Sequence, residues 1–203
     1  IQKNCTVLRE KFSEVFNDEN DLLKFTQFIL TRCFLVVVST PNQESAFRVF
    51  SVMNSRGLDL LPTDIIKSMT IGKLPKDEEQ KYTEKWEELE NLTGRDGFNE
   101  VFTHTRTIFA KERPKKNLLD EFKEYVIKQT SPKSLVDEYL IPYTEAYVCL
   151  KNCDFSSTQN AEEINELLLW LNKTNNHDWM PPAIKFLTDH KNDSVYILWF
   201  IRK

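Results

Sequence analysis

Apolar side chains recur at spacings of three and four residues along most of this chain, which is the period of amphipathic helices. Residues 5–17 and 19–32 both follow this period. The apolar face of the second segment comprises Leu22, Leu23, Thr26, Ile29, Leu30 and Cys33. The sequence therefore predicts that the chain opens with two helices.

A different pattern follows at residues 34–38, which read Phe-Leu-Val-Val-Val. A short apolar run rich in β-branched residues favours a strand, and its continuous apolar character favours one that is covered on both faces. Ser39-Thr40-Pro41 would end it. We expect this to be the one strand of the chain.

Two helices are predicted after the strand. Asn42 can cap the first, whose core face would hold Ala46, Phe50 and Met53. Gly57 stands just past its end, where a left-handed residue commonly closes a helix. Pro62 suits the first position of the next helix, which should stop at Gly72.

From residue 76 onward the pattern is helical throughout, with stops at Gly94 and near Pro114 and a kink at Pro142. The apolar stretch 195–201 could be a strand by composition, but we interpret it as a buried helix. The change of pattern near residue 75 predicts two domains, 1–75 and 76–203. The predicted fold class is mainly α, with a small α/β part followed by a helical bundle.

Composition supports a water-soluble globular chain: 40% of the 203 residues are hydrophobic and 29% are charged. The longest apolar run, residues 33–38, is too short to span a bilayer, and no signal peptide opens the chain. We therefore expect a cytoplasmic protein without a membrane partner. Cys149 and Cys153 are spaced like ordinary helix thiols. A zinc site formed by these two cysteines and a histidine is the alternative.

The net charge is −4, but residues 104–128 carry seven Lys or Arg against four acidic residues. Such a local excess can neutralise the phosphates of a nucleic acid. The candidate DNA contacts are Arg106, Lys111, Arg113, Lys115 and Lys116. The alternative is a solvated helix face.

Common catalytic signatures are missing from the sequence, including the glycine-rich phosphate loops and the Gly-x-Ser-x-Gly elbow. Asp189-His190 could begin a metal-dependent nuclease motif, in which the histidine deprotonates water beside a cation. The pair ends an amphipathic segment, however, and histidine is favoured at a helix C-terminus by the dipole alone. We predict a helix end there and no catalytic residue in this chain.

The most informative segment is residues 46–67, in which a helix turns sharply at Asn-Ser-Arg-Gly and a second helix follows. The turn presents Asn54 and Arg56, and a guanidinium is a planar fork suited to phosphate. Asp64 and Lys67 lie one turn apart near the start of the second helix, where anions are favoured. The alternative is a capped helical corner with an Asp64–Lys67 surface pair.

This segment resembles the Phe-x-x-x-Asn-x-Arg-Gly-x-x-Leu-x-x-x-Asp-x-x-Lys stretch of the ParB-like domain that begins GmrSD-type, modification-dependent restriction endonucleases. A more diffuse likeness continues through Trp86, residues 102–106 and 119–122, and residues 179–182. The resemblance implies a phage-defence enzyme that uses a nucleoside triphosphate and a divalent metal to cut modified DNA. The nucleotide-binding candidates are then Asn54, Arg56, Gly57, Asp64 and Lys67.

Two parts of the family pattern are missing from this sequence. It has no Asp-Gly-Gln-Gln-Arg signature, which the family links to nucleotide hydrolysis, and no histidine nuclease core. We therefore expect an internal, non-catalytic fragment: residues 1–75 would complete the ParB-like domain, and residues 76–203 would be a helical domain, incomplete at its C-terminus. The alternative is a helical protein–protein interaction module, with self-association left open.

Overall fold

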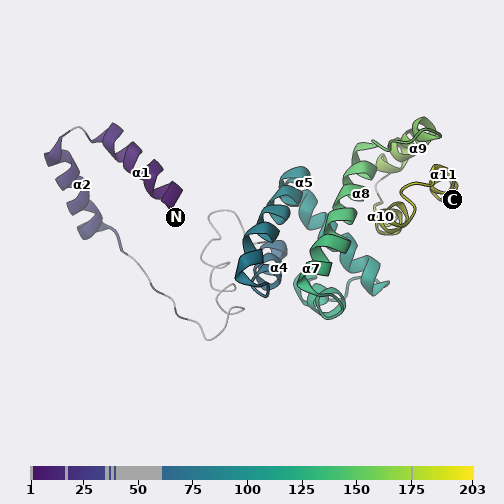
Figure 1. The fold of residues 1–203 in the computed structure, drawn as a ribbon, viewed down its shortest axis with the longest axis horizontal. Helices are drawn as coiled ribbons and strands as arrows, with labels where there is room; N and C mark the ends of the chain where they lie inside the picture. Colours follow the sequence, from purple (N-terminus) through teal and green to yellow (C-terminus); the bar gives the residue numbers. More distant parts are fainter. Residues whose placement is uncertain (1, 17, 35–36, 38, 40–60, 175) are drawn as a thin grey trace. The chain divides into compact units, whose positions relative to one another are not determined.

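The computed structural model describes residues 2–16, 18–34, 37, 39, 61–174 and 176–203 (Figure 1). These residues are mainly helical, and none of them belongs to a strand. The chain divides into two compact units, Ile1–Ala46 and Phe47–Lys203, which are treated separately below.

The first unit contains two helices, α1 (Gln2–Val15) and α2 (Glu19–Arg32). The Asp18 side chain begins α2 by accepting a hydrogen bond from the Asn20 backbone N–H at 3.3 Å. The ring of Phe25 lies 5.7 Å from that of Phe12 and 4.9 Å from that of Phe16, so the two helices touch through these aromatic rings. The predicted helical pair is confirmed.

The apolar face predicted for α2 does not form a core in the structure. No residue of α2 is buried, and Leu30 is 79% exposed. The predicted strand is not seen either: Phe34 and Val37 lie outside any strand and are 89% and 92% exposed. A strand needs a partner strand and covering layers, and the described residues supply neither at these two positions.

The other residues of the predicted strand, and the whole helical corner from Asn42 to Gly57, lie outside the described residues. The small α/β part is accordingly not seen in what the structure describes. The coarser prediction, a mainly helical chain, is confirmed.

The first described elements of the second unit are α4 (Pro62–Ile71) and α5 (Lys76–Ala110). Pro62 occupies the start of α4 and Gly72 caps its end, as predicted. Gly94 interrupts α5 with φ 70° and ψ 167°, a conformation that is essentially open to glycine alone. Tyr82, Trp86 and Leu89 before this break are buried, as are Phe98, Val101 and Phe102 after it. The helical pattern and the stop predicted at Gly94 are confirmed.

A chain of short segments follows: α6 (Leu118–Phe122), the π-helix η1 (Lys123–Ile127), α7 (Pro132–Ser134) and a second π-helix, η2 (Leu135–Leu140). The helix α8 (Ile141–Asn152) continues directly from η2 and carries Pro142 in its first turn. A π-segment changes the hydrogen-bond ladder before a proline that cannot donate to it. The helical pattern predicted from residue 76 onward is confirmed for this part of the chain.

The unit ends with α9 (Ala161–Asn172), α10 (Met180–Asp189) and α11 (Ser194–Ile201). The apolar stretch near the C-terminus is therefore helical rather than a strand, as predicted. Ile197 and Leu198 are its buried residues.

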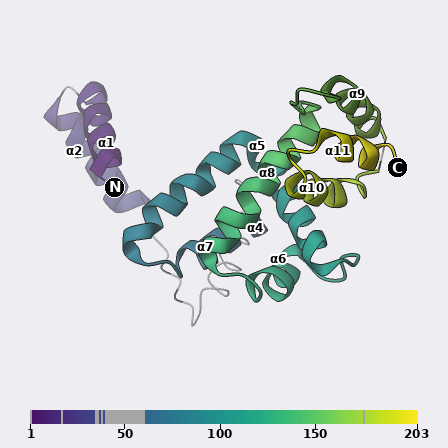
Figure 2. The ribbon, with the colours of Figure 1, turned by 45° about the vertical axis from the view of Figure 1, so that its right-hand side comes forward.

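Two apolar clusters fill this unit. The first contains Trp86, Phe102 and Phe122, and the second contains Ile164 and Met180. The helix α8 packs against both α5 and α10, which Figure 2 shows as neighbouring coils.

Leu74 is buried in the same cluster as Trp86, so packing is continuous across residue 75. The domain boundary expected at residue 75 stays a prediction. The packing of the described residues does not break at this position.

Candidate nucleic-acid interface

The first residues of α4 complete the segment that carries the family resemblance. Oδ2 of Asp64 accepts a hydrogen bond from the Leu61 backbone N–H at 2.9 Å and forms an ion pair of 3.0 Å with Arg95. Lys67 forms an ion pair of 3.1 Å with Glu87. Both partners lie on α5, so these contacts attach α4 to the body of the unit.

The Asp64–Lys67 surface pair of the alternative interpretation is therefore not seen, because each residue pairs with α5 instead. An acidic residue at the third helical position turns back to the uncapped N-terminus, which carries Asp64 away from Lys67. Arg95 was missed by the sequence argument because its position depends on the direction in which α5 turns at Gly94. Asn54, Arg56 and Gly57 lie outside the described residues, and their nucleotide-binding role stays a prediction.

Arg106 is the one candidate DNA contact that the structure removes from the surface. Its side chain is 1% exposed, and its Nε lies 2.6 Å from Oε2 of Glu121, whose side chain is 3% exposed. A guanidinium buried in this way cannot reach a phosphate in solution, so Arg106 is a structural residue.

A signal for this pair was present in the sequence. Arg106 stands four residues after Phe102 and three before Phe109, on the apolar stripe of α5. Glu121 stands three residues after Leu118 and directly before Phe122. A base and an acid at two core positions favour a buried ion pair, because neither charge can be buried alone.

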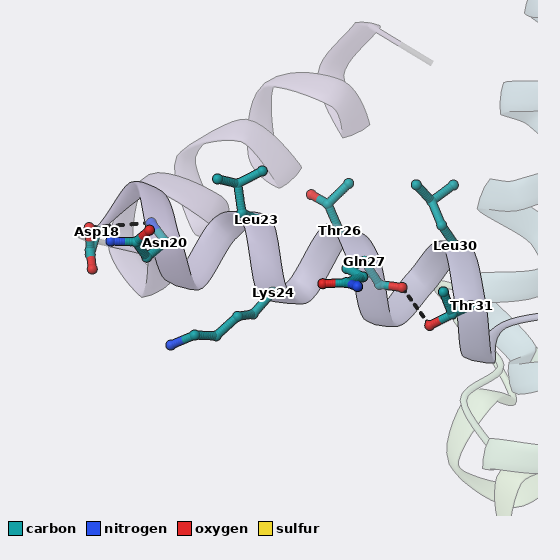
Figure 3. Close-up of a pocket in the computed structure, with 8 residues that line it drawn as sticks. All are labelled: Asp18, Asn20, Leu23, Lys24, Thr26, Gln27, Leu30 and Thr31. Atoms are coloured by element: carbon teal, nitrogen blue, oxygen red, sulfur yellow. Dashed lines mark hydrogen bonds between the residues drawn. The ribbon is translucent and has the colours of Figure 1, made fainter.

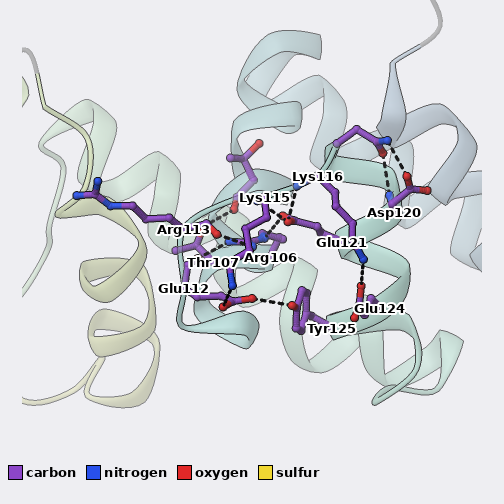
Figure 4. A network of polar contacts seen from close by, with 12 residues as sticks. Arg106, Thr107, Glu112, Arg113, Lys115, Lys116, Asp120, Glu121, Glu124 and Tyr125 are labelled. Atoms are coloured by element: carbon purple, nitrogen blue, oxygen red, sulfur yellow. Dashed lines mark hydrogen bonds and ion pairs between the residues drawn. The ribbon is translucent and has the colours of Figure 1, made fainter.

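The other four candidates lie together in the loop 111–116, which connects α5 to α6 (Figure 4). Lys111, Arg113, Lys115 and Lys116 are all exposed. The ammonium of Lys115 lies 2.6 Å from a carboxylate oxygen of Glu112, and that of Lys116 lies 2.9 Å from one of Glu124. The loop carries four cations and one acid, so it is locally basic in a chain of net charge −4.

The acidic residues around the loop are held in their charged form. Burial alone would raise the pKa of Glu121, but hydrogen bonds from the Lys115 and Lys116 backbone amides and the Arg106 guanidinium outweigh it and lower the pKa. The pKa of Glu112 is also lowered, first by its hydrogen bond from Lys115. Glu112 and Glu121 are thus charged at neutral pH.

His104 adds no positive charge to this surface. Burial lowers the pKa of His104 to about 4, so its ring is neutral at physiological pH. His190 follows α10 as its C-terminal cap and packs on the rings of Phe186 and Tyr196. The helix-end interpretation of Asp189-His190 is confirmed.

The cavities lined by residues that the structure describes give no stronger site. One hollow lies along α2 (Figure 3). All eight residues that line it belong to that helix and its cap, so it is an open surface and not an enclosed site. A second cavity of about 260 Å³ lies between α8 and α10 and is lined in part by Cys149, Thr188 and Lys191. Most of its lining is apolar surface, and two of its charged residues, Glu145 and Lys191, pair with each other at 3.0 Å.

The zinc interpretation of Cys149 and Cys153 is not supported by their surroundings. Burial raises the pKa of Cys149 to about 11, which keeps the thiol protonated. The amide of Asn172 lies 3.3 Å from the Cys153 sulfur. Among the residues that the structure describes, no three histidine, cysteine or acidic side chains gather closely enough to hold a metal ion.

Comparison with family models, with curated proteins and with solved structures found no match to this chain. Within the described ranges, no helix combines the length and apolar character needed to cross a bilayer.

Proposed function

We propose that this chain is a non-catalytic segment of a nucleotide-dependent, modification-dependent DNA restriction endonuclease, and that it links a ParB-like domain to a distal nuclease. The observation that carries the proposal is the segment 46–67, with Asn54, Arg56, Gly57, Asp64 and Lys67 at the spacing of the GmrSD-type motif. In this proposal residues 1–75 complete the ParB-like domain, including its small α/β part.

The attachment of α4 supports a linking role. The residues that precede α4 in the sequence carry the candidate anion-binding side chains, and α4 itself is fixed to α5 by the Asp64–Arg95 and Lys67–Glu87 pairs. Ile66 anchors the same helix in the core, where it is fully buried. A change at the nucleotide would therefore act on a helix that is already joined to the helical body.

The nucleoside triphosphate would be bound only in part by this segment, with Asn54 and Arg56 at one edge of its pocket. The divalent metal and the nuclease chemistry belong to other parts of the enzyme. Modified DNA would pass across the helical body, where Lys111, Arg113, Lys115 and Lys116 offer cations to its backbone.

The test is Arg56→Ala in the protein encoded by the whole reading frame that contains these residues. We expect nucleotide turnover and phage restriction to fall at least about tenfold, because a bidentate phosphate contact is lost. Arg9→Ala, on the exposed face of α1, is the matched control. Wild-type turnover and restriction in Arg56→Ala would refute the pocket assignment.

A second candidate function is a helical protein–protein interaction module. Several large apolar side chains of α9 and α11 are exposed, namely Leu169, Trp170, Val195, Tyr196 and Trp199. Exposed aromatic residues of this kind are typical of docking surfaces. A salt titration separates the two functions: DNA binding weakens steeply with salt, whereas apolar protein association does not.

A further inference from the structure

The loop 111–116 is fixed from inside by the buried pair Arg106–Glu121 (Figure 4). One terminal nitrogen of Arg106 donates to the Glu112 carbonyl at 2.5 Å, and the other donates to the Arg113 carbonyl at 3.3 Å. Oε1 of Glu121 accepts the backbone N–H groups of Lys115 and Lys116 at 2.7 and 2.8 Å. Each of the four residues around Pro114 thus forms one main-chain hydrogen bond with the pair.

This arrangement determines where the side chains of the loop go. Because the main-chain groups face inward, the side chains of Arg113, Lys115 and Lys116 face solvent, and Lys111 is exposed beside them. Lys111 itself is left-handed, with φ 54°, and it ends α5. The loop therefore presents its cations on a main chain whose polar groups are already satisfied.

The pair is costly in terms of stability alone. Apolar residues of similar volume usually stabilise a core as well as or better than a buried ion pair does. They could not, however, bind two carbonyls and two amides of a surface loop. The Arg106 guanidinium also lies 5.6 Å from the centre of the Tyr125 ring, whose hydroxyl donates to Glu112 at 2.6 Å, so the fixation extends to the loop's only acid.

We propose that Arg106 and Glu121 are positioning residues that hold loop 111–116 as a preformed cationic surface for the phosphate backbone of a DNA duplex. The inference rests on the proposed function, which supplies DNA as the partner. A preformed loop binds more tightly than a mobile one, because less conformational freedom is lost on association.

The first experiment measures binding of the 203-residue chain to a short DNA duplex by fluorescence anisotropy over a range of KCl concentrations. Lys111→Gln combined with Arg113→Gln should weaken binding and reduce the slope of log K against log salt by up to about 2, since each phosphate contact contributes roughly 0.9. Lys185→Gln combined with Lys191→Gln removes two exposed cations elsewhere and should leave the slope unchanged.

The second experiment tests positioning with Arg106→Met combined with Glu121→Leu, which keeps the core filled. We expect about tenfold weaker binding with an unchanged salt slope, because the cations remain but must be ordered on binding. Hydrogen exchange should show faster exchange of the Lys115 and Lys116 amides. If near-UV circular dichroism shows that this variant does not fold, Arg106→Lys takes its place. It keeps a cation beside Glu121 but loses the two terminal nitrogens that bind the Glu112 and Arg113 carbonyls, so it should show the same loss of affinity.

The outcomes are distinguishable. Absence of duplex binding by the wild-type chain at low salt would overturn the inference together with the DNA-contact part of the proposed function. Binding that ignores the Lys111–Arg113 substitutions would overturn this surface only. Binding that depends on the loop cations but has equal affinity in the folded pair variant would overturn the positioning role and leave the interface standing.

Discussion

His104 is a histidine that the fold keeps neutral. Its surroundings include Glu100, which raises its pKa, and His177 and Lys151, which lower it, but burial is the largest influence. The ring packs 6.0 Å from that of Tyr147, whose hydroxyl donates to Glu100 at 2.7 Å. Because burial favours the neutral ring, we expect protonation of His104 at low pH to destabilise the folded chain.

We expect His104→Gln to flatten the acid limb of the stability profile. The pKa of His104 is about 4 in the folded chain and 6.5 in its ordinary state, so the unfolded chain binds the proton first as pH falls. The stability contributed by the neutral ring is present above pH 6.5 and is lost progressively down to pH 4. Urea unfolding measured at several pH values in this window tests the prediction.

The matched control is His190→Gln at the end of α10. Four carboxyl groups have lowered pKa values, so their protonation also destabilises the folded chain as pH falls. They belong to Glu100, Glu112, Glu121 and Asp137, and all four remain in both variants. A profile for His104→Gln that stays as steep as that of the wild-type chain would contradict the role assigned to burial.

At the scale of elements, Gly94 divides α5 into two helices that contribute residues to the same core cluster, Trp86 before the break and Phe98 after it. With φ 70° and ψ 167° it lies in a region that side chains disfavour, and a Cβ at this position would meet no neighbour within 4 Å. Glycine is therefore required at position 94 by the backbone conformation and not by a lack of space for a side chain.

We expect Gly94→Ala to lower the free energy of unfolding by about 1–3 kcal/mol because of this strain. Gly97→Ala, in the helical part of α5, is the control: its new Cβ would lie 3.3 Å from the Thr93 Cβ, while alanine favours a helix by about 1 kcal/mol. Chemical denaturation of both variants makes the comparison. A larger loss in Gly97→Ala than in Gly94→Ala would refute the conformational argument.

Local signals in the sequence predicted the elements of the second unit well. Pro62, Gly72, Gly94 and Pro142 act through their own backbone preferences, so their effects could be recognised without knowing the fold. The strand at 34–38 could not be decided in this way, because β-branched content does not say whether a partner strand exists. The Asp64–Arg95 pair joins two helices and depends on packing that spacing alone does not determine. Arg106 and Glu121 could be recognised as buried charges from their apolar neighbours, but their contacts with the loop could not.

For the whole second unit, the main question is whether its two apolar clusters unfold together. Val101 is buried in one cluster and its neighbour Phe102 in the other, although both belong to α5. Phe109 packs against both clusters. Because residues of α5 belong to both clusters, unfolding of this helix would expose the apolar side chains of both.

We therefore expect Phe122→Leu in the first cluster and Leu168→Ala in the second to shift a single unfolding transition. Leu168→Ala should cost about 2–5 kcal/mol, as is usual for a fully buried leucine. Tryptophan fluorescence, to which buried Trp86 contributes from the first cluster, should coincide with helix loss followed by circular dichroism. Two separate transitions in either variant would show that the clusters are independent.

The inward-facing main chain of the loop 111–116 also limits how its length can change. Surface connections commonly accept extra residues, because their backbone is bonded to water. Here the carbonyls of Glu112 and Arg113 and the amides of Lys115 and Lys116 must arrive in register at two fixed side chains. One inserted or deleted residue would leave the buried side chain of Arg106 or Glu121 without some of these hydrogen bonds. We therefore expect the loop to tolerate neither insertions nor deletions.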